Sequence, residues 1–132
     1  MTPALKWLLY SVALTWLMLL MASLARTHGW TVPGMRLAFG NRDDLPEPTP
    51  LAARAERAAR NMVENLVLFA ALVLTAHAAA HVDARVALGA EMFFWARLAY
   101  APLYWAGVHY LRTLAWAIGV AGMGLIALAL LA

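Results

Sequence analysis

The sequence predicts an all-α integral membrane protein, built as a bundle of four transmembrane helices. The chain of 132 residues is 64% hydrophobic and only 13% charged, whereas soluble chains carry about 25% charged residues on average. Four apolar runs have close to the roughly 20 residues that a helix needs to cross the hydrocarbon core. Because the breaks between these runs are too short to separate domains, residues 1–132 are expected to form a single membrane domain.

Each apolar run marks one expected span: residues 5–25, 58–80, 86–104 and 112–131. The first run is expected to remain as a span and not to be cleaved as a signal peptide, because it is long and bulky and lacks a basic start. A cytoplasmic loop is expected over 26–53, where prolines and glycines interrupt a polar stretch. Short turns are expected at 81–85 and 107–110, and Pro102 should kink or weaken the end of the third span.

The basic residues between the spans predict the orientation in the membrane. The second connection carries Arg85, and Arg112 follows the third span. The first connection is the most basic, with Arg26, Arg36, Arg42, Arg54, Arg57 and Arg60. The positive-inside rule therefore places the first and third connections in the cytoplasm and both termini outward.

The formal net charge of +3 does not indicate nucleic-acid binding, because the basic residues flank apolar runs and form no continuous patch. We expect the spans to be surrounded by membrane lipid. The compact loops are typical of a bacterial inner membrane, which is the location we expect, with the endoplasmic reticulum as the alternative.

Polar side chains gather at the cytoplasmic ends of the second and third spans. On the second span, three of them fall within about 60° of one another at 100° per residue: Arg57, Asn61 and Glu64. On the third span, one face carries Phe93, Arg97, Tyr100 and Tyr104. An ionisable residue at the centre of a span costs about 2.5–3.5 kcal/mol and usually faces a partner or a cavity. One interpretation is therefore a structural ion pair between Glu64 and Arg97.

A second interpretation starts from the excess of positive charge at this end of the bundle. Four arginines lie near the single carboxylate of Glu64: Arg57, Arg60, Arg97 and Arg112. Arginine binds carboxylates through two parallel hydrogen bonds, and Glu64 can receive an ammonium. Asn61, Tyr100 and Tyr104 add further hydrogen-bonding groups. This set of residues suits a small zwitterion with two carboxylates and one amine.

The same residues resemble a known family. The stretch Arg57-Ala58-x-x-Asn61-x-x-Glu64-Asn65-Leu66 looks like the signature of the MAPEG family, the membrane-associated proteins in eicosanoid and glutathione metabolism. In the third span, Arg97-x-x-Tyr100-x-x-x-Tyr104, followed by Arg112, resembles the family's second conserved region. The resemblance covers essentially the whole chain.

The resemblance implies a homotrimer that binds glutathione, as a co-substrate and without a metal, between adjacent subunits. Arg112 would activate the glutathione thiol, with Tyr104 as the second catalytic residue. The thiolate would attack a lipophilic electrophile, as in a transferase, or reduce a lipid hydroperoxide. The implied glutathione-binding residues are Arg57, Arg60, Asn61, Glu64, Arg97, Tyr100 and Tyr104.

The chain departs from the family's pattern before Arg112. The spacing from Tyr104 is about one residue longer than in the eicosanoid-forming members, and their basic residues in this turn are missing, with His109 as a possible substitute. One alternative is therefore a catalytically weak MAPEG-fold protein with a structural or interaction role. A more distant one is a small four-helix cation exporter that uses Glu64, although the nearby arginines would repel a cation.

Other polar residues point to no second site. Because the chain has no cysteine, disulfides and thiolate metal sites are excluded. His77 and His81 lie one helical turn apart near Asp83, but no third ligand of clear geometry accompanies them, so no metal site is predicted. Glu91 is read as a helix-end group. Small residues at four-residue spacing in the last span should support helix packing: Ala115 with Gly119, and Ala117 with Ala121.

Overall fold

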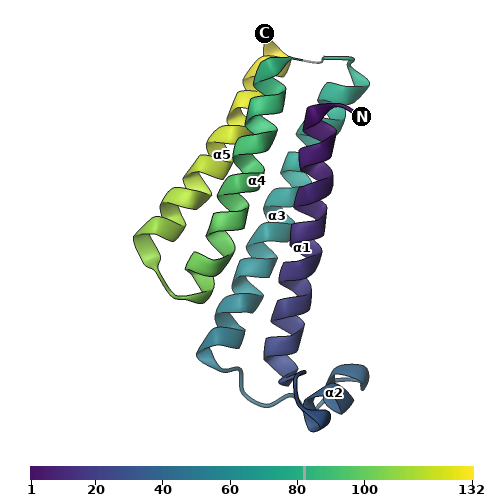
Figure 1. Ribbon diagram of the computed structural model, residues 1–132, viewed down its shortest axis with the longest axis vertical. Helices are drawn as coiled ribbons and strands as arrows, with labels where there is room; N and C mark the ends of the chain where they lie inside the picture. The colour runs from purple at the N-terminus through teal and green to yellow at the C-terminus, as the bar shows by residue number, and fades with distance from the viewer. Residues whose placement is uncertain (82) are drawn as a thin grey trace.

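The computed structural model describes residues 1–81 and 83–132, and within these ranges every regular element is a helix. The elements are α1 (Pro3–Thr27), α2 (Val32–Phe39), α3 (Pro50–Ala78), α4 (Ala84–Trp105) and α5 (His109–Leu131). Figure 1 shows α1, α3, α4 and α5 side by side as a long bundle, with the short α2 set apart beyond one end. The prediction of an all-helical protein is confirmed.

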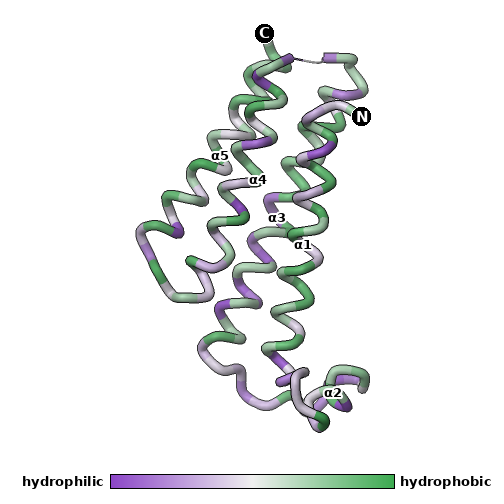
Figure 2. Tube along the Cα trace, viewed as in Figure 1, coloured by the Kyte–Doolittle hydropathy of each residue, from purple (hydrophilic) through white to green (hydrophobic). Residues whose placement is uncertain are grey.

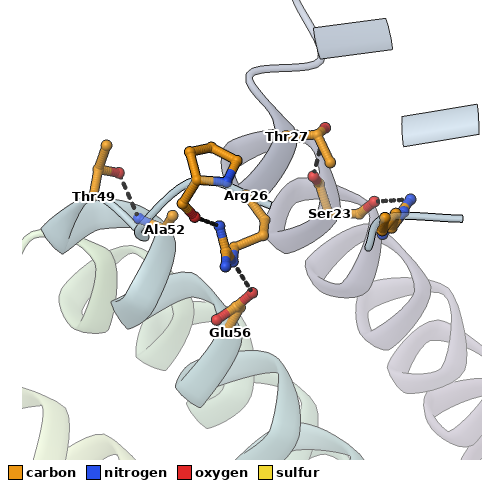
Figure 3. A network of polar contacts seen from close by, with 8 residues as sticks. Ser23, Arg26, Thr27, Thr49, Ala52 and Glu56 are labelled. Atoms are coloured by element: carbon orange, nitrogen blue, oxygen red, sulfur yellow. Dashed lines mark hydrogen bonds and ion pairs between the residues drawn. The ribbon is translucent and has the colours of Figure 1, made fainter. Parts of the chain in front are cut away.

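The helices begin where the sequence supplies caps. Thr2, Thr31 and Thr49 each accept a hydrogen bond from the first turn of a helix that also has a proline there, which is the favoured chemistry of a helix start. The bond from the N–H of Ala52 to Thr49 Oγ1 measures 3.1 Å and is drawn in Figure 3. Asp83 caps α4 in the same way, whereas α5 starts after Val108 with no side-chain cap.

Three of the described helices, α1, α3 and α5, are long and apolar enough to cross a membrane. Their outward-facing surfaces carry large hydrophobic side chains such as Leu9, Trp16, Leu74 and Leu128, and hydrophobic colour follows the long helices in Figure 2. The fourth long helix, α4, has 22 residues and three charged side chains, and it contacts α1, α3 and α5.

Several predicted boundaries need correction. The predicted loop over 26–53 is wrong in two places, because residues 32–39 form α2 and α3 already begins at Pro50. The turn predicted at 107–110 is earlier and shorter, since α5 begins at His109. In the turn predicted at 81–85, residues 84 and 85 belong to α4, and position 82 lies outside the described residues. Pro102 lies inside α4, which continues to Trp105.

A glycine crossing brings α4 and α5 close together. A Cβ atom on Gly89 would lie 2.5 Å from the carbonyl oxygen of Gly122, and one on Gly122 would lie 2.6 Å from the carbonyl oxygen of Gly89. Both glycines are buried. The backbones of the two helices therefore touch directly, which is how helices associate in lipid, where packing replaces the hydrophobic effect.

Candidate functional site

Two stacked aromatic rings pack between α3 and α4 near the centre of the bundle. Phe69 and Phe93 lie with their ring centroids 4.0 Å apart and an interplanar angle of 13°, and both side chains are fully buried. Offset aromatic stacking of this kind adds to the burial of the rings themselves. The stack separates the apolar half of the α3 and α4 interface from the polar half that follows toward α2.

One turn beyond Phe93, the fully buried side chain of Arg97 extends from α4 toward α3. Its Nη1 donates a hydrogen bond to Oδ1 of Asn61 at 2.9 Å. Asn65, also buried, donates from Nδ2 to the backbone oxygen of Asn61 at 2.8 Å. Within the described residues, the Nε and Nη2 atoms of Arg97 have no hydrogen-bond partner. The guanidinium therefore has donors to spare at this position.

Aromatic rings flank this guanidinium and continue as a row along α4. The Cζ atom of Arg97 lies 5.3 Å from the ring centroid of Phe93 and 5.2 Å from that of Tyr100. The rings of Tyr100 and Tyr104 are 5.4 Å apart, edge to face. Arg112 of α5 then covers Tyr104, with its Cζ 4.3 Å from the ring centroid. Two cation–π contacts and one edge-to-face ring contact thus connect two arginines through two tyrosines.

The turn between α4 and α5 places Arg112 at the start of a helix. Gly107 adopts a φ of +77° in this turn, a conformation that glycine reaches without strain. Arg54 of α3 donates from Nε to the carbonyl oxygen of Trp105 at 2.8 Å and so fixes the end of α4. Because α5 has no side-chain cap, its first N–H groups and its dipole favour a negative charge beside Arg112.

The remaining predicted residues lie on the exposed side of α3. Arg57, Arg60 and Glu64 are all exposed, and none of them forms an ion pair within the described residues. Arg60 and Glu64 line a groove that Leu19 and Ala22 of α1 close from the other side. The structure thus joins Asn61, Arg97, Tyr100, Tyr104 and Arg112 into one cluster and leaves the other three beside it.

The predicted ion pair between Glu64 and Arg97 is wrong for the single subunit. At 100° per residue, Glu64 is rotated by about 60° from Asn61 on α3. That rotation turns Glu64 toward the groove beside α1, while Asn61 faces α4 and receives the hydrogen bond from Arg97. The buried cation is therefore held by a neutral amide and two rings, without a carboxylate.

Sequence reasoning missed several residues that support the cluster. Asn65 orients Asn61, and a Cβ atom on Gly119 would lie only 3.3 Å from Nε of Arg97. Arg26 pairs with Glu56 at 3.3 Å and also donates to the carbonyl of Pro46, which fastens α1 to the start of α3 (Figure 3). The sequence signals for these residues are the place of Asn65 in the family-like motif and the four-residue spacing of Gly119 from Ala115.

The opposite end of the bundle holds a separate polar group. Asp83 accepts hydrogen bonds from Nε and Nη2 of Arg85 at 2.9 and 2.7 Å, and Nε2 of His81 lies 3.8 Å away. These contacts occupy Arg85, so it is not paired with Glu91, which is exposed in a groove between α4 and α5. In the described ranges, no three His, Asp or Glu side chains are placed to hold a metal ion.

The model of the MAPEG family matches residues 4–132, which is nearly the whole chain. No curated protein and no solved structure gives a match. The apolar helices and the family match together identify an integral membrane protein. The buried cluster lies within the matched range, and the chain belongs to the MAPEG family.

Proposed function

We propose that this protein binds glutathione at the cluster around Arg97 and transfers its thiolate to lipophilic electrophiles or uses it to reduce lipid hydroperoxides. The observation that carries the proposal is the buried Arg97, which keeps two unpartnered donor atoms in a cluster that ends at Arg112. A buried cation with free donors is costly unless it receives an anion. Glutathione offers two carboxylates and a thiolate.

The exposed residues of α3 complete the binding set. Arg57, Arg60 and Asn61, together with the free donors of Arg97, would bind the carboxylates, and Glu64 would bind the ammonium. Tyr100 and Tyr104 would line the pocket, with the hydroxyl groups as donors to the ligand. In the single subunit the residues of α3 are open on one side, so a neighbouring copy in a homotrimer would close the pocket.

The exposed carboxylate of Glu91 supports an oligomer independently. An ionisable group at membrane depth costs about 2.5–3.5 kcal/mol at a helix centre when it faces lipid. Because Glu91 is exposed on α4, a second copy that covers this face would remove that cost. We propose that α4 is the fourth span, since its charged Arg97 is hidden inside the bundle.

For the thiol chemistry, the position of Arg112 supplies the electrostatic argument. A cysteine-like thiol with a pKa of about 8.5 is roughly 3% ionised at pH 7. A guanidinium and a helix N-terminus that lower this value by about two units raise the thiolate to about 75%. The amount of nucleophile then increases by about 25-fold, before any gain from positioning.

The two reactions differ in the bond that the thiolate forms. In conjugation, sulfur forms a bond to an electrophilic carbon, and the leaving group departs with its electron pair while the thiol proton goes to water. In peroxide reduction, sulfur attacks the terminal peroxide oxygen, which gives an alcohol and a sulfenic acid. A second glutathione then converts the sulfenic acid to a disulfide and water.

The distribution of arginines supports an orientation with the α2 end of the bundle in the cytoplasm and both termini outward. The compact loops support a bacterial inner membrane as the location. Glutathione, a water-soluble molecule, would reach the cluster from the cytoplasm, and the second substrate would reach it from the bilayer.

The alternative, a MAPEG-fold protein with weak catalysis, is favoured by one observation. The contact between Arg97 and Asn61 fastens two helices without any ligand.

Calorimetry with glutathione and the detergent-purified protein tests the proposal. Saturable binding should be lost in Arg57→Ala and in Glu64→Ala. The matched controls are Arg85→Ala and Glu47→Ala, which change the same residue types away from the cluster, with Glu47 exposed in the loop before α3, and both should keep the affinity of the unchanged protein. Absence of binding at millimolar glutathione, with the helical content intact, would overturn the proposal and leave the cluster with a structural role.

A further inference from the structure

The short helix α2 has a buried face and an exposed apolar face. Gly34 is buried, and Leu37 and Ala38 are half-buried on the same side. On the opposite side, the exposed fractions are 69% for Val32, 40% for Met35 and 85% for Phe39, and Trp30, just before the helix, is 68% exposed. These four residues, Trp30, Val32, Met35 and Phe39, are called the α2 stripe. They line a shallow depression together with Arg36.

The structure fixes the direction in which the α2 stripe points. A Cβ atom on Gly34 would collide with the backbone oxygens of Thr27 and His28, so α2 lies directly on the end of α1. Thr31 donates from Oγ1 to the oxygen of His28 at 2.9 Å. Beyond the helix, Arg42 donates from Nη2 to Oγ of Ser23 at 3.0 Å. Attachment at both ends prevents α2 from turning its apolar side toward the bundle.

These attachments also place α2 at the level of the membrane surface. The 25 residues of α1 exceed the roughly 20 that cross the hydrocarbon core, so its last turn emerges near Ser23. Because Arg42 reaches back to Ser23, the chain after α2 returns to this same level. Figure 1 shows α2 beside the end of α1 and away from α4 and α5. The α2 stripe therefore lies near the level at which α1 leaves the hydrocarbon core.

The charges near the α2 stripe match a phospholipid surface. From residue 28 to residue 42 the chain has arginines at positions 36 and 42, and the first carboxylates, Asp43 and Asp44, come after Arg42 and outside α2. Arg36 borders the α2 stripe and has no ion-pair partner within the described residues. Tryptophan at the boundary, apolar side chains below it and arginine among the phosphates are the features of a helix that lies in a membrane interface.

We propose that α2 is an interfacial helix: the α2 stripe inserts into the acyl boundary of the leaflet at which α1 ends, and Arg36 binds the phosphate of an anionic phospholipid there. The occupant of the exposed face is thus the protein's own membrane. The insertion holds the end of α1, and through Arg26 and Glu56 the start of α3, at a fixed depth.

Because the chain has no cysteine, single nitroxide labels can test this proposal in the full-length protein. Met35→Cys and Phe39→Cys would be labelled and reconstituted into phosphatidylcholine vesicles with and without phosphatidylglycerol. Asp44→Cys, an exposed polar position shortly after α2, is the matched control. Oxygen, which concentrates in lipid, should reach the labels at 35 and 39 several-fold better than a water-soluble nickel complex does, with the reverse at 44.

The contribution of Arg36 has its own measurement. Phosphatidylglycerol should increase the immersion of the label at Met35→Cys, and Arg36→Gln should abolish this increase while the helical content stays unchanged. Equal exposure of positions 35, 39 and 44 to the nickel complex would overturn the proposal. Strong spin–spin coupling between labels at position 39 of different copies would also overturn it, because another copy, and not lipid, would then cover the α2 stripe.

Discussion

Arg97 on α4 and Asn61 on α3 form the one side-chain hydrogen bond that crosses the middle of the bundle within the described residues, at 2.9 Å. A fully buried guanidinium thus depends on a single neutral amide. A hydrogen bond to a charged group contributes about 1.5–3 kcal/mol, and its loss leaves the charge without compensation. The stability of the protein and its proposed ligand site therefore share these two residues.

The first prediction concerns this bond. Asn61→Leu should lower the free energy of unfolding by about 1.5–3 kcal/mol, measured by denaturant titration in detergent. In the background of Arg97→Met, which removes the buried charge, the same change should have a much smaller effect. Equal losses in both backgrounds would mean that Asn61 stabilises the bundle without its bond to Arg97.

The second prediction concerns the glycine crossing of α4 and α5. Gly122→Ala should lower the free energy of unfolding by about 1–3 kcal/mol, because the added methyl group pushes the two backbones apart. Gly124→Ala is the matched control: nothing lies within 4 Å of a Cβ atom at that position, so the change should be neutral or slightly stabilising. A similar loss at both positions in thermal unfolding would argue against direct backbone contact.

The third prediction concerns acid stability. The hydrogen bonds from the side chain and backbone N–H of Arg85 hold the pKa of Asp83 below its usual range. A carboxyl with a lowered pKa in the folded state stabilises it fully above its unfolded value of about 3.9, and this contribution is lost as the pH falls through the folded value. The midpoint of thermal unfolding should therefore fall at acidic pH, more steeply for the unchanged protein than for Asp83→Asn.

Asp83→Asn retains an oxygen to cap α4 and removes only the charge, so it isolates the ionic part of the contact. The other carboxylates titrate equally in both proteins, and the difference between the two pH curves reports Asp83 alone. Parallel curves would show that the interaction with Arg85 has no net effect on stability.

The fourth prediction rests on the proposed glutathione chemistry. Arg112→Leu should keep the affinity for glutathione within a few-fold but lower the thiolate fraction at neutral pH, followed by ultraviolet absorbance of the bound ligand, with a matching loss of conjugation rate. Tyr104→Phe keeps the ring beneath the guanidinium and removes only the hydroxyl group, so it should lower the thiolate fraction less than Arg112→Leu does. If Arg112→Leu abolished binding altogether, Arg112 would hold the ligand and not activate its thiol.

Much of the fold could be predicted from the sequence, because long apolar runs leave a chain few choices in a membrane. The helix α2 was missed since its evidence is not local. Gly34 and Gly40 interrupt the stretch and favour a loop, whereas Gly34 is needed only because α2 lies on the backbone of Thr27 and His28. That contact depends on the path of the chain after α1, which no short window of sequence reveals.

In the candidate site too, features that depend on neighbouring residues in the sequence could be predicted, and features that depend on how the helices pack could not. Helical periodicity places Asn61 on the polar face of α3 and Arg97 on the polar face of α4, because this requires only the angle per residue. It could not decide between Asn61 and Glu64 as the partner of Arg97, since that choice depends on the rotation of α3 against α4. Similarly, Ala117 and Ala121 were grouped with small packing residues and are exposed, while Gly89 and Gly122 make the close crossing.

The arginine contacts described above have a mechanical consequence. The side-chain bonds between distant segments, among the described residues, lie in the half of the bundle nearer α2: Arg26 with Pro46 and Glu56, Arg42 with Ser23, Arg54 with Trp105, and Arg97 with Asn61. At the far end, the described residues show no side-chain hydrogen bond between helices, and packed side chains together with the backbone contact at Gly89 and Gly122 hold the helices together. Directional contacts between helices are thus concentrated at the α2 end of the bundle. We therefore expect the helices to separate most readily at the opposite side of the bilayer.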